Sequence, residues 1–449
     1  MKLTLLPSDK GDCLLLEASN DTTILIDGGM ADSYIKHVRP FLGKWRKKNK
    51  RPLDLVYLSH IDQDHIAGVL QLMNDLVAWR VFRHKKAKNE PWDEPSFPEP
   101  PDIARLWHNG FHDLIGDNAG DIGSILAARA AQLNNSANAE LRKLGAEYQA
   151  IAASIPESIR LSGRVSAQQL NIPLNKEFGG KLAILRDPPD EIRLKNSGSL
   201  RIRIVGPFEK DLERLREKWN AWLRDKKNKA NLNKTRAWRD EEDQRLDFSS
   251  ILPLDIDDEL GDRKQVTEEN LASLLLFVEQ QGKRILLTGD GHSTDIVRGL
   301  KHNGLLAEKG GLHVNVLKVQ HHGSEHNLDR AFARTITADH YVICGNGRHE
   351  NPDLRVLKVI AESRIGTKDE SSANPETGNV FNVWFNCSVA FLEREIAERK
   401  AEKQPFKELT TAAEHFAKIE GDMHEYAAKS DGKMKLHFLK NKPLELELS

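Results

Sequence analysis

Four side chains able to bind a metal ion stand within six positions of this sequence, directly after an apolar run. Residues 55–58 (LVYL) have the length and the β-branched and aromatic content of a buried strand. The next residues, 59–68, read SHIDQDHIAG. Apolar residues then recur at helical spacing from Ile66, so a helix is expected to begin there. A junction of strand and helix lets imidazoles and carboxylates converge, which predicts a metal site. The alternative is a polar turn rich in capping Asp and Ser.

Three other apolar runs end in polar residues that point to the same chemistry. Residues 24–29 (ILIDGG) read as a strand ending at Asp27, and residues 285–290 (ILLTGD) as a strand ending at Asp290. Residues 317–324 (LKVQHHGS) close a buried strand with His321 and His322. Asp27 either supports a histidine ligand from behind or caps its own turn.

Together the four motifs resemble the metallo-β-lactamase superfamily. Residues 59–65 resemble its His-x-His-x-Asp-His signature, with Asp62 in place of the second His. The variant Ser-His-x-Asp-x-Asp-His is most similar to the soluble hydrolase domain of ComEC-type competence proteins. The matching segments fall in residues 1–110 and 269–388. The resemblance implies an α/β fold, a four-layer αβ/βα sandwich of two mixed sheets packed face to face.

The resemblance also implies a set of ligands, carried over position by position. One ion is expected on His60, Asp62 and His108, and a second on Asp64, His65 and His349, with Asp290 between them. His84 and His112 are rivals for the place of His108. Asn351 stands where relatives often carry another His, so the choice of His349 is open. Asp27 and Ser59 are expected to support the ligands.

The expected catalytic residues are Asp64, His321, His322 and Ser324. One of the two histidines is expected to protonate a leaving alkoxide, and the other to be buried behind the ligands. Ser324 and the backbone N–H of Gly323 are expected to hold phosphate oxygens. Two divalent ions about 3.5–4 Å apart can share a hydroxide and clamp both oxygens of an in-line displacement.

The first expectation for function is therefore a metal-dependent phosphodiesterase or nuclease that uses a metal-bridging hydroxide. A hydrolase of a small ester, lactam or thioester is the alternative enzyme, and a partner-binding regulatory module on the same scaffold is the alternative of another class. The expected cofactors are two divalent ions, zinc or manganese, with magnesium also open. Asp62 makes its site harder than an imidazole would, which moves its preference toward manganese.

Length and composition add further expectations. The 449 residues suggest a first half of the fold at 1–110, a mainly helical insertion at 111–268 with short strands returning to the core, a second half at 269–392, and an extension at 393–449. A nucleic-acid or nucleotide substrate is expected, and the insertion or extension is a candidate site for a protein partner. No apolar run approaches the ~20 residues of a membrane span and no secretory signal is evident, so a cytoplasmic location without membrane contact is expected.

Several expectations concern local structure. Strands are expected at 79–82, 181–185 and 388–392, a charged helix at 393–430, and a paired couple of strands at 434–448. Residues 209–246 mix Lys and Arg with Trp, and read either as a solvated helix or as a nucleic-acid surface. The three cysteines, Cys13, Cys344 and Cys387, lie in apolar surroundings and are expected to be reduced core residues.

Overall fold

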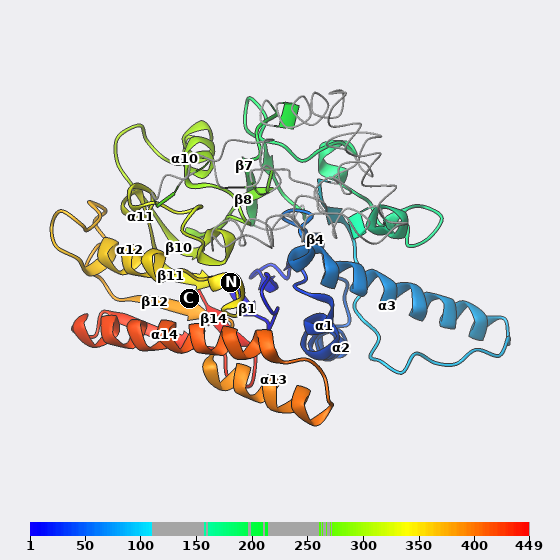
Figure 1. Cartoon of the computed structure of the whole chain (residues 1–449). Coiled ribbons are helices and arrows are strands. Elements are labelled where there is room, and N and C mark those ends of the chain that lie inside the picture. The colour runs from blue at the N-terminus through cyan, green and yellow to red at the C-terminus, as the bar shows by residue number, and fades with distance from the viewer. Residues whose placement is uncertain are drawn as a thin grey trace, which may run out of the picture.

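A computed structural model of the chain describes residues 1–109, 157–158, 160–195, 199–209, 212–213, 260–261, 263, 266, 270 and 272–448. His112 and most of the charged segment 209–246 lie outside the described residues. Within the described part, helices lie on the outer side of two sheets (Figure 1). No helix among these residues combines the length and apolar character needed to cross a membrane.

The first sheet has six strands in the order β14-β1-β2-β3-β4-β5. Strands β14 to β3 pair antiparallel, and β3, β4 and β5 run parallel. The bounds are β1 (Lys2–Leu5), β2 (Leu14–Glu17), β3 (Thr23–Ile26), β4 (Leu55–Tyr57), β5 (Leu106–Trp107) and β14 (Leu444–Glu447).

The second sheet has eight strands in the order β13-β12-β11-β10-β9-β8-β7-β6. The run from β13 to β9 is parallel, and β9 to β6 is antiparallel, so the sheet is mixed. The bounds are β6 (Glu191–Ile192), β7 (Arg201–Gly206), β8 (Leu275–Gln280), β9 (Lys283–Leu287), β10 (Leu312–Lys318), β11 (Ile336–Ile343), β12 (Phe381–Phe385) and β13 (Met434–Phe438).

Helices cover the outer face of each sheet. The six-stranded sheet carries α1 (Ala31–Ser33), the π-helical segment η1 (Tyr34–Val38), α2 (Arg39–Asn49) and α3 (Gln63–Ala87). The eight-stranded sheet carries α10 (Ser293–His302), α11 (Arg330–Thr335), α12 (Leu354–Ile365), α13 (Val389–Ala401) and α14 (Lys407–Lys429). Short 3₁₀ turns occur at η3 (Lys176–Phe178), η5 (Gln320–Gly323) and η6 (Arg348–Glu350).

Alternation of side chains along the strands explains the layering. In β8, Leu275 and Phe277 pack under the helices, whereas Leu276 and Val278 pack between the two sheets. A strand buried on both faces must be apolar throughout, which accounts for its continuous apolar sequence. Three apolar clusters therefore separate four layers, and the expected αβ/βα sandwich is confirmed.

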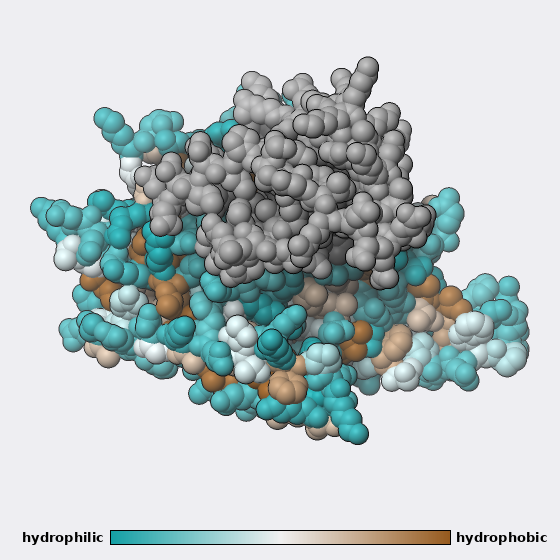
Figure 2. All heavy atoms as spheres, in the orientation of Figure 1, coloured by the Kyte–Doolittle hydropathy of each residue, from teal (hydrophilic) through white to brown (hydrophobic). Residues whose placement is uncertain are grey.

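The outer surface is mainly hydrophilic where Figure 2 shows described residues, with apolar residues in small separate patches. All three cysteines are buried free thiols. Burial raises the pKa of each thiol well above its usual value.

Five local expectations were wrong. The single charged helix expected at 393–430 is two helices, α13 and α14, separated by residues 402–406. Residues 79–82 continue α3, because Phe82 extends the buried face of that helix. Residues 181–185 form only an isolated bridge at Leu185. Residues 388–392 begin α13, where the Ser388 hydroxyl accepts a hydrogen bond from the Phe391 N–H at 3.0 Å and caps the helix. The two terminal strands do not pair with each other, since β13 joins β12 and β14 joins β1.

The expected insertion and the C-terminal extension also contribute strands to the sheets. Strands β6 and β7, from the expected insertion, extend the eight-stranded sheet beyond β8. Strand β14, from the C-terminal extension, forms one edge of the six-stranded sheet. The domain boundaries themselves stay a prediction.

Candidate metal centre

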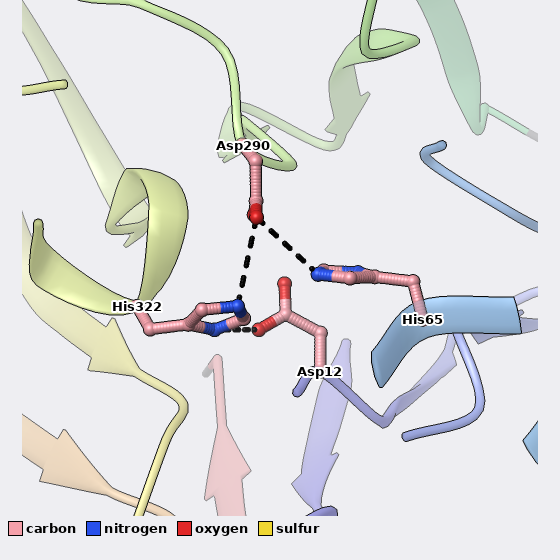
Figure 3. A group of neighbouring side chains, drawn as sticks. All are labelled: Asp12, His65, Asp290 and His322. Atoms are coloured by element: carbon pink, nitrogen blue, oxygen red, sulfur yellow. Dashed lines mark ion pairs between the residues drawn. The ribbon is translucent and has the colours of Figure 1, made fainter. Parts of the chain in front are cut away.

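The candidate site lies where strands of both sheets end. Asp27 follows β3, residues 59–65 link β4 to α3, and His108 follows β5. From the second sheet come Asp290 after β9 and residues 318–322 at the end of β10. In Figure 3, Asp12, His65, Asp290 and His322 point toward one another, and their ligand atoms lie within 4.8 Å of each other.

One carboxylate oxygen, Oδ2 of Asp290, has four imidazoles around it. The Nε2 atoms of His60, His65 and His322 each lie 3.5 Å from this oxygen. The Nε2 atom of His321 lies 3.7 Å from it. Histidines from both sheets therefore converge on one carboxylate oxygen.

Each of these four histidines has its other ring nitrogen, Nδ1, close to an oxygen. For His60, His65 and His321 these oxygens can accept a hydrogen bond, which assigns the hydrogen to Nδ1 and leaves Nε2 to face the centre. His322 Nδ1 instead meets Asp12 as an ion pair, and its Nε2 also faces the centre. The pairs are His60 with Ser59 Oγ at 3.0 Å, His65 with Asp27 Oδ2 at 3.0 Å, His321 with Asn327 Oδ1 at 2.7 Å, and His322 with Asp12 Oδ1 at 3.1 Å.

Asp27 and Ser59 lie where they were expected, behind the ligands. The Ser59 hydroxyl donates to Asp27 Oδ2 at 2.8 Å, and the Ser59 N–H donates to Asp27 Oδ1 at 2.7 Å. The hydroxyl is therefore an acceptor toward His60 and His65. This small network fixes the orientation of both rings.

Backbone packing holds the start of α3 against the end of β3. Gly28 N–H donates to the His65 carbonyl at 3.0 Å, and Gly68 N–H donates to the Gly29 carbonyl at 2.9 Å. A Cβ on Gly68 would lie 1.9 Å from the Gly28 carbonyl oxygen. Only glycine permits this approach, and it fixes the helical turn that carries Asp64 and His65.

The remaining acidic candidates also face this centre. Asp62 Oδ2 lies 3.6 Å from His60 Nε2, and Asp64 Oδ2 lies 3.5 Å from His322 Nε2.

His108 is buried, and its Nε2 lies 3.4 Å from Ser158 Oγ. Burial, followed by the charge of His60, lowers the pKa of His108 to about 3, so its imidazole is neutral at pH 7.

Buried polar atoms without a hydrogen-bond partner among the described residues test whether a metal suits the site. They include ligand atoms on both expected halves: His60 Nε2, His65 Nε2, His108 Nδ1, His322 Nε2, Asp62 Oδ1 and Asp290 Oδ1. Buried polar groups are ordinarily paired, and imidazole nitrogens and carboxylate oxygens are what divalent transition metals bind. The donor set therefore suits divalent ions.

Charge leads to the same conclusion. Among the described residues, the centre combines five carboxylates (Asp12, Asp27, Asp62, Asp64 and Asp290) with one buried ammonium, that of Lys318, which contacts Asp12 and Asp290. With neutral imidazoles the excess is four negative charges, which two divalent cations would balance. Without metal cations, protons bound by histidines balance part of this negative charge. Although burial opposes the charged form, Asp290 and Asp12 raise the pKa of His322 to about 9. Asp290 and Asp27 likewise raise the pKa of His65.

The adjacent histidines 321 and 322 differ in charge. Burial, opposed by the charge of Asp290 and reinforced by that of His322, lowers the pKa of His321 to about 4. His322 instead contacts Asp12, Asp64 and Asp290. Both residues have left-handed backbones, with φ of 44° and 55°, a strained conformation typical of functional sites.

Some expected residues are not brought to the centre. His349 is an exposed residue of η6, outside the group that contains His322. His84 is exposed in the last turn of α3, roughly 30 Å along the helix from its start. The Ser324 side chain is completely buried, and its N–H donates to the His321 carbonyl at 2.9 Å. Their expected roles stay predictions.

Two residues of the centre were missed from the sequence. Asp12 is not among the expected ligands or supporting residues, and Lys318 was considered only within the run at 317–324. The available signal was that Gly11-Asp12 precedes the buried run at 14–16 and that a lysine interrupts the apolar run at 314–319. A lysine buried at 2% exposure requires an acidic partner, and Asp12 is that partner.

Comparison with known proteins gives one family. Residues 7–128 match the model of the metallo-beta-lactamase superfamily, a segment that includes Asp12, Asp27, the 59–68 motif and His108. No curated protein matches the sequence significantly. The crystal structure of Zn²⁺-bound PqqB from Methylobacterium extorquens aligns over 100% of both chains, with 10% identity and a TM-score of 0.29. The chain thus contains a segment of metallo-beta-lactamase type, whose family implies a metal-dependent hydrolase.

Proposed function

We propose that this protein is a metal-dependent hydrolase of phosphodiesters, a nuclease or nucleotide phosphodiesterase. The observation that carries the proposal is the group of four Nε2 atoms 3.5–3.7 Å from Asp290 Oδ2. Divalent ions bound there would lower the pKa of a water molecule and stabilise charge on the scissile group. His60, Asp62 and His108 would hold one ion, and Asp64, His65 and His322 would hold a second, with Asp290 available to both.

The residues of the chain have separate tasks in this reaction. His60, His65 and His322 present unprotonated Nε2 atoms when each carries its hydrogen on Nδ1, beside Ser59 Oγ, Asp27 Oδ2 and Asp12 Oδ1. His321 is neutral at pH 7 and is 8% exposed, so it can exchange a proton with a group at the mouth of the centre. We assign to its unprotonated Nε2 the uptake of the proton released by the attacking water and the transfer of that proton to the leaving oxygen.

A phosphodiester is favoured over a neutral ester or lactam by charge. Although burial acts in the opposite direction, the contact with His322 and then the charge of Lys10 lower the pKa of the Asp64 carboxyl. A partly exposed cation beside a metal ligand would attract an anionic group to the centre. The similarity of residues 59–65 and 317–324 to the ComEC-type hydrolase domain supports the same substrate class.

The test is hydrolysis by the metal-loaded full chain. Substrates are bis(p-nitrophenyl) phosphate, single- and double-stranded DNA, RNA, p-nitrophenyl acetate and a cephalosporin lactam, each with Zn²⁺, Mn²⁺ and Mg²⁺. We expect phosphodiester cleavage that His65→Ala abolishes. His313→Ala is the matched control, since His313 also pairs with an aspartate, Asp339 at 3.0 Å, but at the opposite end of β10. Turnover of the acetate or lactam alone would refute the substrate class, and full activity of His65→Ala would refute the site.

A further inference from the structure

The end of β10 places a lysine inside the candidate metal centre. Lys318 is 2% exposed. Its ammonium group forms an ion pair with Asp12 Oδ2, donates to the Gly289 carbonyl at 3.1 Å, and lies 3.7 Å from Asp290 Oδ1. Although burial alone would lower the pKa of Lys318, the carboxylates of Asp12 and Asp290 raise it. This lysine is therefore a fixed positive charge.

Asp12 connects this charge to a histidine of the centre. One oxygen of Asp12 contacts Lys318, and the other lies 3.1 Å from His322 Nδ1. On its far side, His322 Nε2 lies 3.5 Å from both Asp64 Oδ2 and Asp290 Oδ2. The contacts form a continuous row from Lys318 through Asp12 to His322 and Asp290. Figure 3 shows Asp12, His322 and Asp290.

A second histidine of the centre shows what the lysine supplies. His65 also has an aspartate at Nδ1, but the carboxylate of Asp27 accepts hydrogen bonds from the Ser59 N–H and hydroxyl. Asp12 has the ammonium of Lys318 in place of such donors. A buried carboxylate needs one or the other to compensate its charge. Without the ammonium of Lys318, the Asp12 carboxylate would lose the contact that holds it beside His322 Nδ1.

We infer that Lys318 is a positioning residue that acts through Asp12 to keep His322 Nε2 facing the metals and, by its charge beside Oδ1, turns Oδ2 of Asp290 toward the imidazoles. This role rests on the proposed metal-dependent function. Lys318 touches no substrate in this assignment. Its effect is on the geometry and strength of metal binding.

The test compares four variants of the full chain with the wild type. Lys318→Met keeps the length of the side chain and removes its charge, and Asp12→Asn keeps the shape of the carboxylate. The double variant removes both the ammonium and the carboxylate, so it leaves no unpaired charge from this ion pair. Lys2→Met is the matched control, since Lys2 also pairs with a carboxylate, that of Glu17 at 2.8 Å, in the other sheet. Each metal-stripped protein is titrated with Zn²⁺ by calorimetry, and the visible spectrum of its Co²⁺ form is recorded.

Removing a group that orients a metal ligand costs roughly 10–100-fold in metal affinity, and this is the loss expected for Lys318→Met and for Asp12→Asn. The double variant should bind Zn²⁺ no more weakly than the weaker single variant, because both changes interrupt one row of contacts. The Co²⁺ spectra of all three should differ from that of the wild type, while Lys2→Met should match it. A role in folding alone would lower thermal stability without changing affinity or spectrum.

Other outcomes would overturn the inference. A Zn²⁺ affinity of Lys318→Met within twofold of that of the wild type would contradict it. So would a loss of affinity in the double variant equal to the product of the losses in the two single variants. If Lys318→Met does not fold, the double variant decides: wild-type affinity there contradicts the inference. A wild type that binds no Zn²⁺, Mn²⁺ or Co²⁺ would refute the proposed function as well, whereas equal binding by wild type and variants would refute only the role of Lys318.

Discussion

Gly68→Ala should damage both stability and the metal centre, because one methyl group would displace the turn that carries two ligands. The new Cβ would lie 1.9 Å from the Gly28 carbonyl oxygen, so α3 must move away from β3. Overpacking of this kind costs about 1–3 kcal/mol. The backbone hydrogen bonds at Gly28 and Gly68, 3.0 and 2.9 Å long, are each worth about 1 kcal/mol. The higher helix propensity of alanine relative to glycine offsets about 1 kcal/mol of this loss.

The net expectation is a loss of about 2–4 kcal/mol in the free energy of unfolding, measured by urea denaturation of the metal-stripped protein. Metal affinity should fall as well, since Asp64 and His65 move with the helix. Gly421→Ala is the control: Gly421 lies within α14, and a Cβ there meets nothing within 4 Å. It should gain up to about 1 kcal/mol. Equal stability changes in the two variants would refute the close-approach argument.

Three further predictions follow from single side chains. His322→Ala should weaken metal binding by at least tenfold, while His349→Ala should leave it unchanged; a larger effect of His349→Ala in calorimetry would restore that residue as a ligand. Asp62→His should shift the preference in activity from Mn²⁺ toward Zn²⁺, and best activity with Zn²⁺ that this change leaves unaltered would contradict the expectation. Glu395→Gln should cost roughly 1–2 kcal/mol at pH 7, a value reduced for partial exposure. Although burial acts in the opposite direction, His37 and Lys36 lower the pKa of Glu395 to about 2 from 4.5, so its contribution is present above pH 4.5 and is lost as pH falls toward 2. Urea denaturation at pH 7 and near pH 2 should show the difference shrink, and a constant difference would count against the ion pair.

The motifs that end strands were predictable because their spacing constrains geometry. A strand followed at once by a helix leaves little freedom at residues 59–68, so the convergence of His60 and His65 follows from local sequence. Likewise the apolar runs of β8, β9 and β10 are long enough and apolar enough to require burial on both faces.

Contacts between segments far apart in the sequence could not be predicted from local patterns. Asp12 meets Lys318 and His322 only because the two sheets pack together, and no local pattern pairs residues some 300 positions apart. The distinction between His322 and His349 has the same origin, since both follow strands of one sheet. Residues 388–392 were misassigned for a different reason: a short apolar run suits a strand or a helix, and the Ser388 cap decided it.

The central claim is that imidazoles and carboxylates around Asp290 Oδ2 hold two divalent ions. The direct measurement is the number of Mn²⁺ or Zn²⁺ ions bound per chain at saturation, by equilibrium dialysis of the metal-stripped wild type and of Asp290→Asn. We predict two ions per chain in the wild type, with at least one lost and the other weakened in Asp290→Asn. A wild type that binds no ion, or an Asp290→Asn variant that binds two with unchanged affinity, would contradict the claim.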